Sequence, residues 1–154
     1  MSAFVAEHAE RSHAFVVAAP LRRAFALFEP EGERAWAEGW DPVYLQPADG
    51  RPTRGMVFTT SHGNEATVWM MVRHEPAQGL VEYVRMTPGS RIGRVLVQCS
   101  ALDAARTRVN VVYALTGLSA AGNAVIRDLD AGRYERFIEG WSAAIERVLS
   151  VELR

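Results

Sequence analysis

The sequence contains no lysine, because all 17 of its basic residues are arginine. Reactions that proceed through a lysine Schiff base or a lysine nucleophile are therefore excluded. The chain also has only one cysteine, Cys99, which excludes an internal disulfide and a metal site built from thiolates alone. Long apolar runs are missing as well. The longest covers residues 14–21, whereas a transmembrane helix needs about 20 such residues.

An excess of charge of either sign is absent too. The formal net charge is −1, which gives no basic surface for nucleic acid. The first 15 residues interrupt their apolar side chains with Glu7, His8, Glu10 and Arg11, unlike a secretory signal peptide. These features predict a cytoplasmic protein that neither inserts into a membrane nor binds nucleic acid.

The length of 154 residues predicts one domain covering 1–154. Residues 13–20 are typical of a strand. Leu21, Phe25 and Phe28 then share one face of a short helix. A second short helix is predicted over 30–40.

Strand patterns fill the middle of the chain. Six are predicted, over 43–45, 55–61, 65–75, 79–86, 91–102 and 107–118. In the last two, apolar and polar residues alternate, as in a sheet with one buried face. Segments 66–73 and 80–86 are apolar in both phases, so their inward face stays open.

The chain is predicted to end in one long helix capped by Ser119. Its apolar stripe comprises Phe137, Ile138, Trp141, Ala144, Ile145 and Val148. Extending the stripe backwards at helical spacing adds Tyr134 and Asp130. An antiparallel sheet with helices on one side is an α+β architecture.

The element order, with "FEPEGERAWAEGWDPVYL", "TPGSRIG" and "LTGLSAAGNAVIRDL", resembles the START/Bet v 1-like (SRPBCC) superfamily. It is most similar to the bacterial polyketide cyclase, dehydrase and lipid-transport proteins of that group. The resemblance implies a helix-grip fold, in which a seven-stranded antiparallel sheet surrounds the C-terminal helix and leaves a deep apolar cavity. Members bind lipids, sterols, polyketides or plant hormones, and some are cyclases.

Side chains expected to surround a ligand come from the helices and from inward strand positions. They are Trp36, Trp40, Trp69, Tyr83, Arg85, Val97, Cys99, Tyr113, Tyr134, Phe137 and Trp141. Ordinary core packing is the alternative for the aromatic ones. Candidate acid–base groups are Asp130, Tyr134 and Tyr113. A dry Asp130 would have a raised pKa; alternatively Gly132 loosens the helix and lets Asp130 reach water, or Asp130 pairs with Arg73 or Arg85.

Two arginines and two tryptophans leave alternatives open. Arg73 and Arg85 each interrupt an apolar strand, and could hold a ligand carboxylate if inward or be solvated if outward. Trp36 and Trp40 lie four residues apart. We expect Trp36 to close the cavity and Trp40 to contribute more to stability.

Other chemistry lacks its sequence signal. The four histidines show no metal-binding spacing, no dinucleotide fingerprint or nucleophile elbow is present, and Cys99 reads as an inert buried thiol. No metal and no cofactor are expected. The sequence favours binding of a small apolar or amphipathic ligand. A cyclase or dehydratase acting on a polyketide-like substrate and a co-chaperone-like interaction protein are the alternatives.

Overall fold

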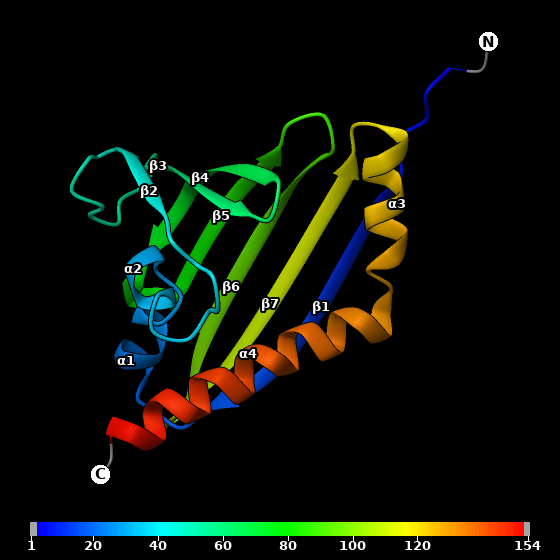
Figure 1. Cartoon of the computed structure of the whole chain (residues 1–154). Helices are drawn as coiled ribbons and strands as arrows, with labels where there is room; N and C mark the ends of the chain where they lie inside the picture. Colours follow the sequence, from blue (N-terminus) through cyan, green and yellow to red (C-terminus); the bar gives the residue numbers. More distant parts are fainter. Residues whose placement is uncertain (1–2, 153–154) are drawn as a thin grey trace.

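The computed structural model describes residues 3–152, which form one seven-stranded antiparallel sheet and four α-helices (Figure 1). The strands are β1 (His8–Val17), β2 (Val43–Gln46), β3 (Val57–His62), β4 (Glu65–Glu75), β5 (Leu80–Thr87), β6 (Arg91–Asp103) and β7 (Arg106–Gly117). The helices are α1 (Leu21–Ala26), α2 (Pro30–Glu33), α3 (Ala120–Asp128) and α4 (Ala131–Glu152), with a 3₁₀ turn η1 (Pro76–Gln78) before β5.

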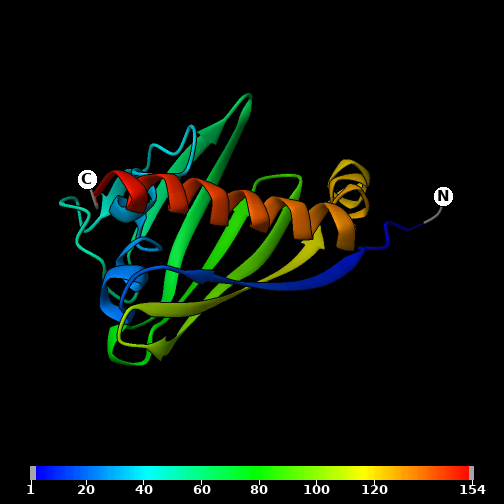
Figure 2. The same ribbon diagram turned by 90° about the horizontal axis from the view of Figure 1, so that it is seen from below.

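The strand order is β1-β7-β6-β5-β4-β3-β2, so the first and last strands of the chain are neighbours. Figure 2 shows the sheet curving around α4, which runs across its concave side from α3 towards α1. The predicted α+β helix-grip architecture is confirmed. No helix within residues 3–152 is long and apolar enough to cross a bilayer.

The alternating strands bury the predicted side chains. Val95 and Val97 on β6 and Val109 and Val111 on β7 are at most 3 % exposed. The structure also shows which side chains of β4 and β5 point inward, a question that the sequence left open. On β4 the inward side chains are Thr67, Trp69 and Met71, and on β5 they include Tyr83 and Arg85.

A β-bulge decides the position of Arg73. Thr67, Trp69 and Met71 alternate inward, so an unbroken strand would turn Arg73 inward as well. The pairing of β4 with β5 shifts between Met71 and Arg73, and an extra residue of this kind reverses the phase. Arg73 therefore faces solvent beside Glu75, while His74 contacts Glu29 with Nε2 to Oε2 at 2.7 Å.

The single C-terminal helix expected from Ser119 is in fact two helices. Ser119 does cap a helix, since its Oγ accepts a hydrogen bond from the backbone N–H of Gly122 at 3.0 Å. That helix ends at Leu129, whose φ and ψ of −88° and 64° are not helical. Asp130 then caps α4 by accepting the N–H of Arg133 at 2.9 Å. The break turns Asp130 out of the apolar stripe.

The second short helix is also shorter than predicted. Its α-helical part ends at Glu33, and residues 34–40 continue as turns. Trp36 and Trp40 therefore lie on an irregular segment, which carries both rings to the end of the sheet below α4. The first strand starts at His8, earlier than the predicted residue 13.

Candidate functional site

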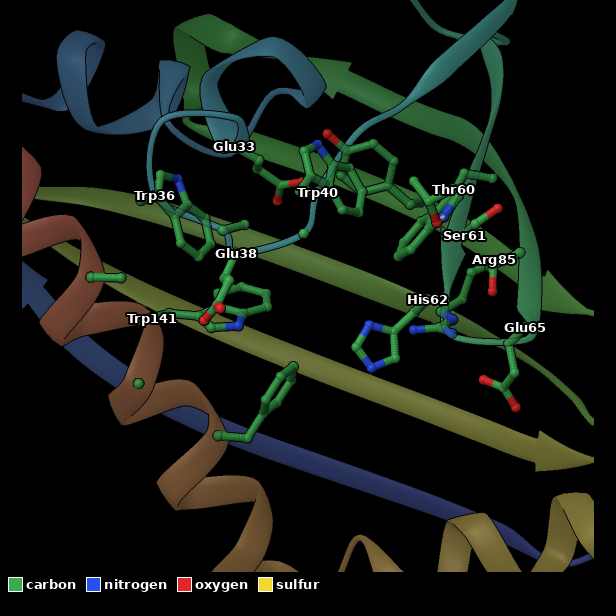
Figure 3. Close-up of a pocket in the computed structure, with 18 of the residues that line it drawn as sticks. Glu33, Trp36, Glu38, Trp40, Thr60, Ser61, His62, Glu65, Arg85 and Trp141 are labelled. Carbon is green, nitrogen blue, oxygen red and sulfur yellow. Dashed lines mark hydrogen bonds between the residues drawn. The ribbon is translucent and has the colours of Figure 1, made fainter.

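An open cavity of about 510 Å³ lies between the concave face of the sheet, α4 and the segment that follows α2. Aromatic residues form one part of its wall: Trp36, Trp40, Trp69, Tyr83, Tyr113, Phe137 and Trp141. Charged and polar residues form another part: Glu33, Glu38, Thr60, Ser61, His62, Glu65, Thr67, Arg85, Arg91 and Arg147. Figure 3 shows Trp36, Trp40 and Trp141 around one end of this space and Arg85, His62 and Glu65 at the other. Of the eleven residues expected to bind a ligand, eight line this cavity. Seven of them are the aromatic residues, and the eighth is Arg85.

The two tryptophans after α2 present carbon rather than nitrogen to the cavity. The indole N–H of Trp36 donates to the carbonyl of Leu27 at 2.8 Å, and that of Trp40 donates to the carbonyl of Pro30 at 2.9 Å. Because both N–H groups are satisfied by the backbone, the rings offer flat apolar surface to a ligand.

The depths of these two rings differ from the expectation. Trp36 is only 8 % exposed and packs against Phe28 and Trp141, with ring centroids 5.9 Å and 5.2 Å away. Trp40 is half-buried and meets Trp69 edge-on at 5.5 Å. Trp36 is therefore the inner ring, while Trp40 is the one nearer solvent.

The charged end of the cavity is formed by two arginines. The Arg85 guanidinium lies 4.9 Å from the centroid of the Trp69 ring, directly across the β4–β5 pair. Burial lowers the pKa of Arg85, and its Nε is enclosed without a hydrogen-bond partner among the described residues. Arg91 instead pairs with Glu65 through two N···O contacts of 3.1 Å, which lower the pKa of that carboxyl.

Glu33, the last residue of α2, is an acid of the cavity wall that sequence reasoning missed. Burial raises its pKa well above the ordinary value, and no cation or hydrogen-bond donor offsets this effect. The residue is half-buried and lines the cavity. The one sequence signal for a cavity position of Glu33 is its spacing of three residues from Trp36. Acidic residues near the start of a helix are usually interpreted as solvated, so the signal was not used.

Tyr113 is the one candidate acid–base residue that reaches the cavity. It lies on β7 near Arg85, and desolvation raises its pKa to about 12. A phenol of this kind is a hydrogen-bond donor near neutral pH rather than a base.

The two other candidates lie elsewhere. Tyr134 is 1 % exposed and donates its hydroxyl hydrogen to the carbonyl of Val111 at 2.6 Å, outside the cavity wall. Asp130 is exposed, and hydrogen bonding by the backbone of Arg133 lowers its pKa. The idea of a dry Asp130 with a raised pKa is therefore wrong, because the residue caps a helix in solvent.

Val97 and Cys99 belong to the packed core beneath the cavity rather than to its wall. They are 1 % and 2 % exposed. Burial raises the pKa of the Cys99 thiol to about 12, so the group is a neutral, unreactive thiol.

We expect Tyr134→Phe to lower the free energy of unfolding by about 1 kcal/mol, because the Val111 carbonyl loses its buried donor. Urea denaturation of the two proteins measures this. Tyr113→Phe is the matched control, since the Tyr113 hydroxyl interacts with the Arg85 side chain and does not donate to a buried backbone carbonyl as Tyr134 does. An equal loss of stability in both variants would contradict this structural role for Tyr134.

No protein-family model matches this sequence, and no curated protein is significantly similar to it. Solved structures are similar in fold. Norcoclaurine synthase from Thalictrum flavum, in complex with dopamine and hydroxybenzaldehyde, is 9% identical with a TM-score of 0.69, covering 97% of this chain and 90% of that chain. An uncharacterized protein from Rhizobium leguminosarum is 16% identical with a TM-score of 0.66, covering 93% and 97%.

A third solved structure, Ara h 8.0201, is 11% identical with a TM-score of 0.65, covering 94% of this chain and 99% of that chain. These likenesses extend over nearly the whole of each chain. At such low identity they show the fold alone, which is the helix grip of Bet v 1-like proteins.

Proposed function

We propose that this Bet v 1-like helix-grip protein binds a small amphipathic molecule, mostly apolar, in the cavity between the sheet and α4. The observation that carries the proposal is the aromatic wall, whose indole N–H groups at Trp36 and Trp40 are already bonded to the backbone. Such a wall gains free energy by covering apolar ligand surface. A few directed polar groups, among them Arg85 and Tyr113, would orient the molecule.

The structural neighbours support this kind of ligand without identifying it. The norcoclaurine synthase structure holds dopamine and hydroxybenzaldehyde, two small aromatic molecules. A cavity of about 510 Å³ in the present chain is of the size that small-molecule sites have.

Filling part of the cavity should weaken ligand binding without damaging the fold. Gly140 on α4 lines the cavity, has ordinary helical geometry, and a Cβ placed there meets no atom within 4 Å. We expect Gly140→Leu to weaken binding of the uncharged fluorophore N-phenyl-1-naphthylamine by roughly tenfold or more, because overlap with added methylenes costs ~1–3 kcal/mol. Fluorescence titration measures the affinity.

The control is the same replacement on the same helix outside the cavity. Gly132 is exposed near the start of α4, where a Cβ would make only ordinary contacts. Gly132→Leu should leave dye binding unchanged, while both variants keep or slightly raise their stability. If the unmodified protein does not bind the dye, or if Gly140→Leu binds it as well as the parent does, the proposal fails.

Glu33 favours a second candidate, a cyclase or dehydratase acting on a polyketide-like molecule. A buried carboxyl with a raised pKa can retain its proton and deliver it to a carbonyl or departing hydroxyl of a bound substrate. In this alternative Glu33 and Tyr113 replace Asp130 and Tyr134 as the acid–base pair. Lost turnover of a polyketide-like substrate in Glu33→Gln, with dye binding intact, would favour the enzyme.

A further inference from the structure

Arg85 carries a half-buried positive charge, with its Nε fully enclosed, that no ion pair among the described residues neutralises. It lies on β5, in the inward phase that also holds Tyr83, and its pairing partner on β6 is Gly93, which contributes no side chain. The carboxylate at this end of the cavity, Glu65, already accepts two hydrogen bonds from Arg91. No ion pair joins Arg85 to an acid anywhere in residues 3–152.

A guanidinium in this position is incompletely compensated. Arginine remains protonated in proteins, so the charge persists despite burial. The Trp69 face, 4.9 Å from the guanidinium carbon, supplies a cation–π contact, and the Tyr113 hydroxyl interacts with the same side chain, but Nε still has no hydrogen-bond partner among the described residues. Burying an ionised group without a partner is costly, and an anionic ligand group would remove that cost.

We propose that Arg85 binds the carboxylate of the ligand, so that the cavity selects small aromatic or apolar monocarboxylic acids over their neutral analogues. This inference rests on the proposed function and specifies the chemistry of the same cavity. The planar fork of the guanidinium matches a carboxylate, which can accept two parallel N–H bonds.

The opposite end of the cavity fixes the orientation. Glu33 lies beside Trp36 and Trp40, well separated from Arg85 across the cavity (Figure 3). A ligand carboxylate placed there would meet the Glu33 carboxyl, whose burial no cation offsets. The remaining arginine of the wall, Arg147 on α4, is exposed, so water already solvates its charge. The acid group therefore lies at the Arg85 end and the apolar body lies against Trp36, Trp40 and Trp141.

The test compares a carboxylic acid with its amide at equal shape. The uncharged dye N-phenyl-1-naphthylamine reports occupancy, and 2-naphthoate and 2-naphthamide compete for the cavity. We expect the unmodified protein to release the dye at a naphthoate concentration at least about tenfold below that of the amide, which is the size of a charge-assisted hydrogen bond. Arg85→Gln should remove this preference, measured as the ratio of the acid and amide competition constants after each is corrected for the dye affinity of the same variant.

Matched variants distinguish an effect of the charge at Arg85 from an effect of the net charge of the protein. Arg73→Gln removes an arginine on the solvent side of β4 and should keep the tenfold preference. Arg85→Met, which retains a long stem against Trp69, should behave like Arg85→Gln and provides a second variant if the glutamine protein unfolds. Arg85→Lys should retain part of the preference, since it keeps the charge but loses the fork.

Three results would overturn the inference. They are equal competition by acid and amide in the unmodified protein, a preference that survives Arg85→Gln and Arg85→Met, and stronger competition by 2-naphthyl phosphate than by 2-naphthoate. The last result would assign a phosphate in place of the carboxylate. Dye binding with no preference for the acid would leave the proposed cavity function standing, whereas absence of dye binding would remove the proposed function itself.

Discussion

Replacing Trp36 with alanine is expected to lower the free energy of unfolding by about 3–5 kcal/mol, the usual cost of removing a large buried ring. Trp36 is 8 % exposed, contacts Phe28 and Trp141, and donates its N–H to Leu27. Trp40→Ala should cost less, about 1–3 kcal/mol, because the Trp40 ring is half-buried. Urea denaturation of both variants measures the difference.

Ligand response should follow the opposite order. Trp40 lies nearer solvent at the cavity, so Trp40→Phe changes the surface that a ligand covers with little effect on the core. We expect Trp40→Phe to shift the affinity for N-phenyl-1-naphthylamine more than Trp36→Phe does. If Trp40→Ala proves the more destabilising change, the assignment of Trp36 as the inner ring is wrong.

Replacing Glu33 with glutamine should raise the free energy of unfolding at neutral pH, because the folded protein then no longer holds a carboxyl whose ionised form is disfavoured by burial. Burial raises the pKa of Glu33 in the folded state above its ordinary 4.5. Above pH 4.5 the unfolded chain loses the proton while the folded chain retains it, so the carboxyl lowers stability as pH rises towards its folded pKa. Glutamine has no such titration.

The difference between parent and variant should therefore vanish near pH 4 and grow between pH 5 and 8. Thermal or urea unfolding across this range measures it. Glu38→Gln is the matched control, because Glu38 also lines the cavity but is exposed and should show no comparable gain. If the difference in stability between Glu33→Gln and the parent is the same at pH 4 and at pH 8, the buried environment of Glu33 is contradicted.

Sequence periodicity was sufficient to orient β6 and β7, but not β4 and β5, because burial on one face imposes a period of two only where the other face is polar. Val95 to Cys99 and Val109 to Leu115 show this alternation, and the odd-numbered residues in both ranges are buried. The helix break was not foreseen, although Asp130 is of a residue type that favours the N-cap position. A continuous apolar stripe concealed it, because periodicity alone does not register one non-helical residue such as Leu129.

The site was predictable in its aromatic members and unpredictable in its charged ones. Large aromatic side chains on the helix and at the strand ends are stabilised by burial, so the sequence already indicated that they face the interior. Arg73 and Arg85 looked alike in sequence, and only the bulge after Met71 separates them. Glu33 was missed because its environment depends on a turn that brings residues 34–40 beneath α4, a long-range arrangement with no local signal.

The strand order has a consequence for assembly of the chain. β1 pairs only with β7, and its His8 faces Thr116, about a hundred residues later. Strands β3 to β6 each pair with the strand that follows in the sequence, so these pairs can form as soon as both strands are synthesised. The pairing of β1 requires β7, which is synthesised much later. Closing so long a loop is entropically unfavourable and slows folding.

Until then, the unpaired edge of β1 and the aromatic wall of the cavity can form non-native contacts. The cavity is sheltered only once α4 has packed beside β1, so binding competence is a late event in folding.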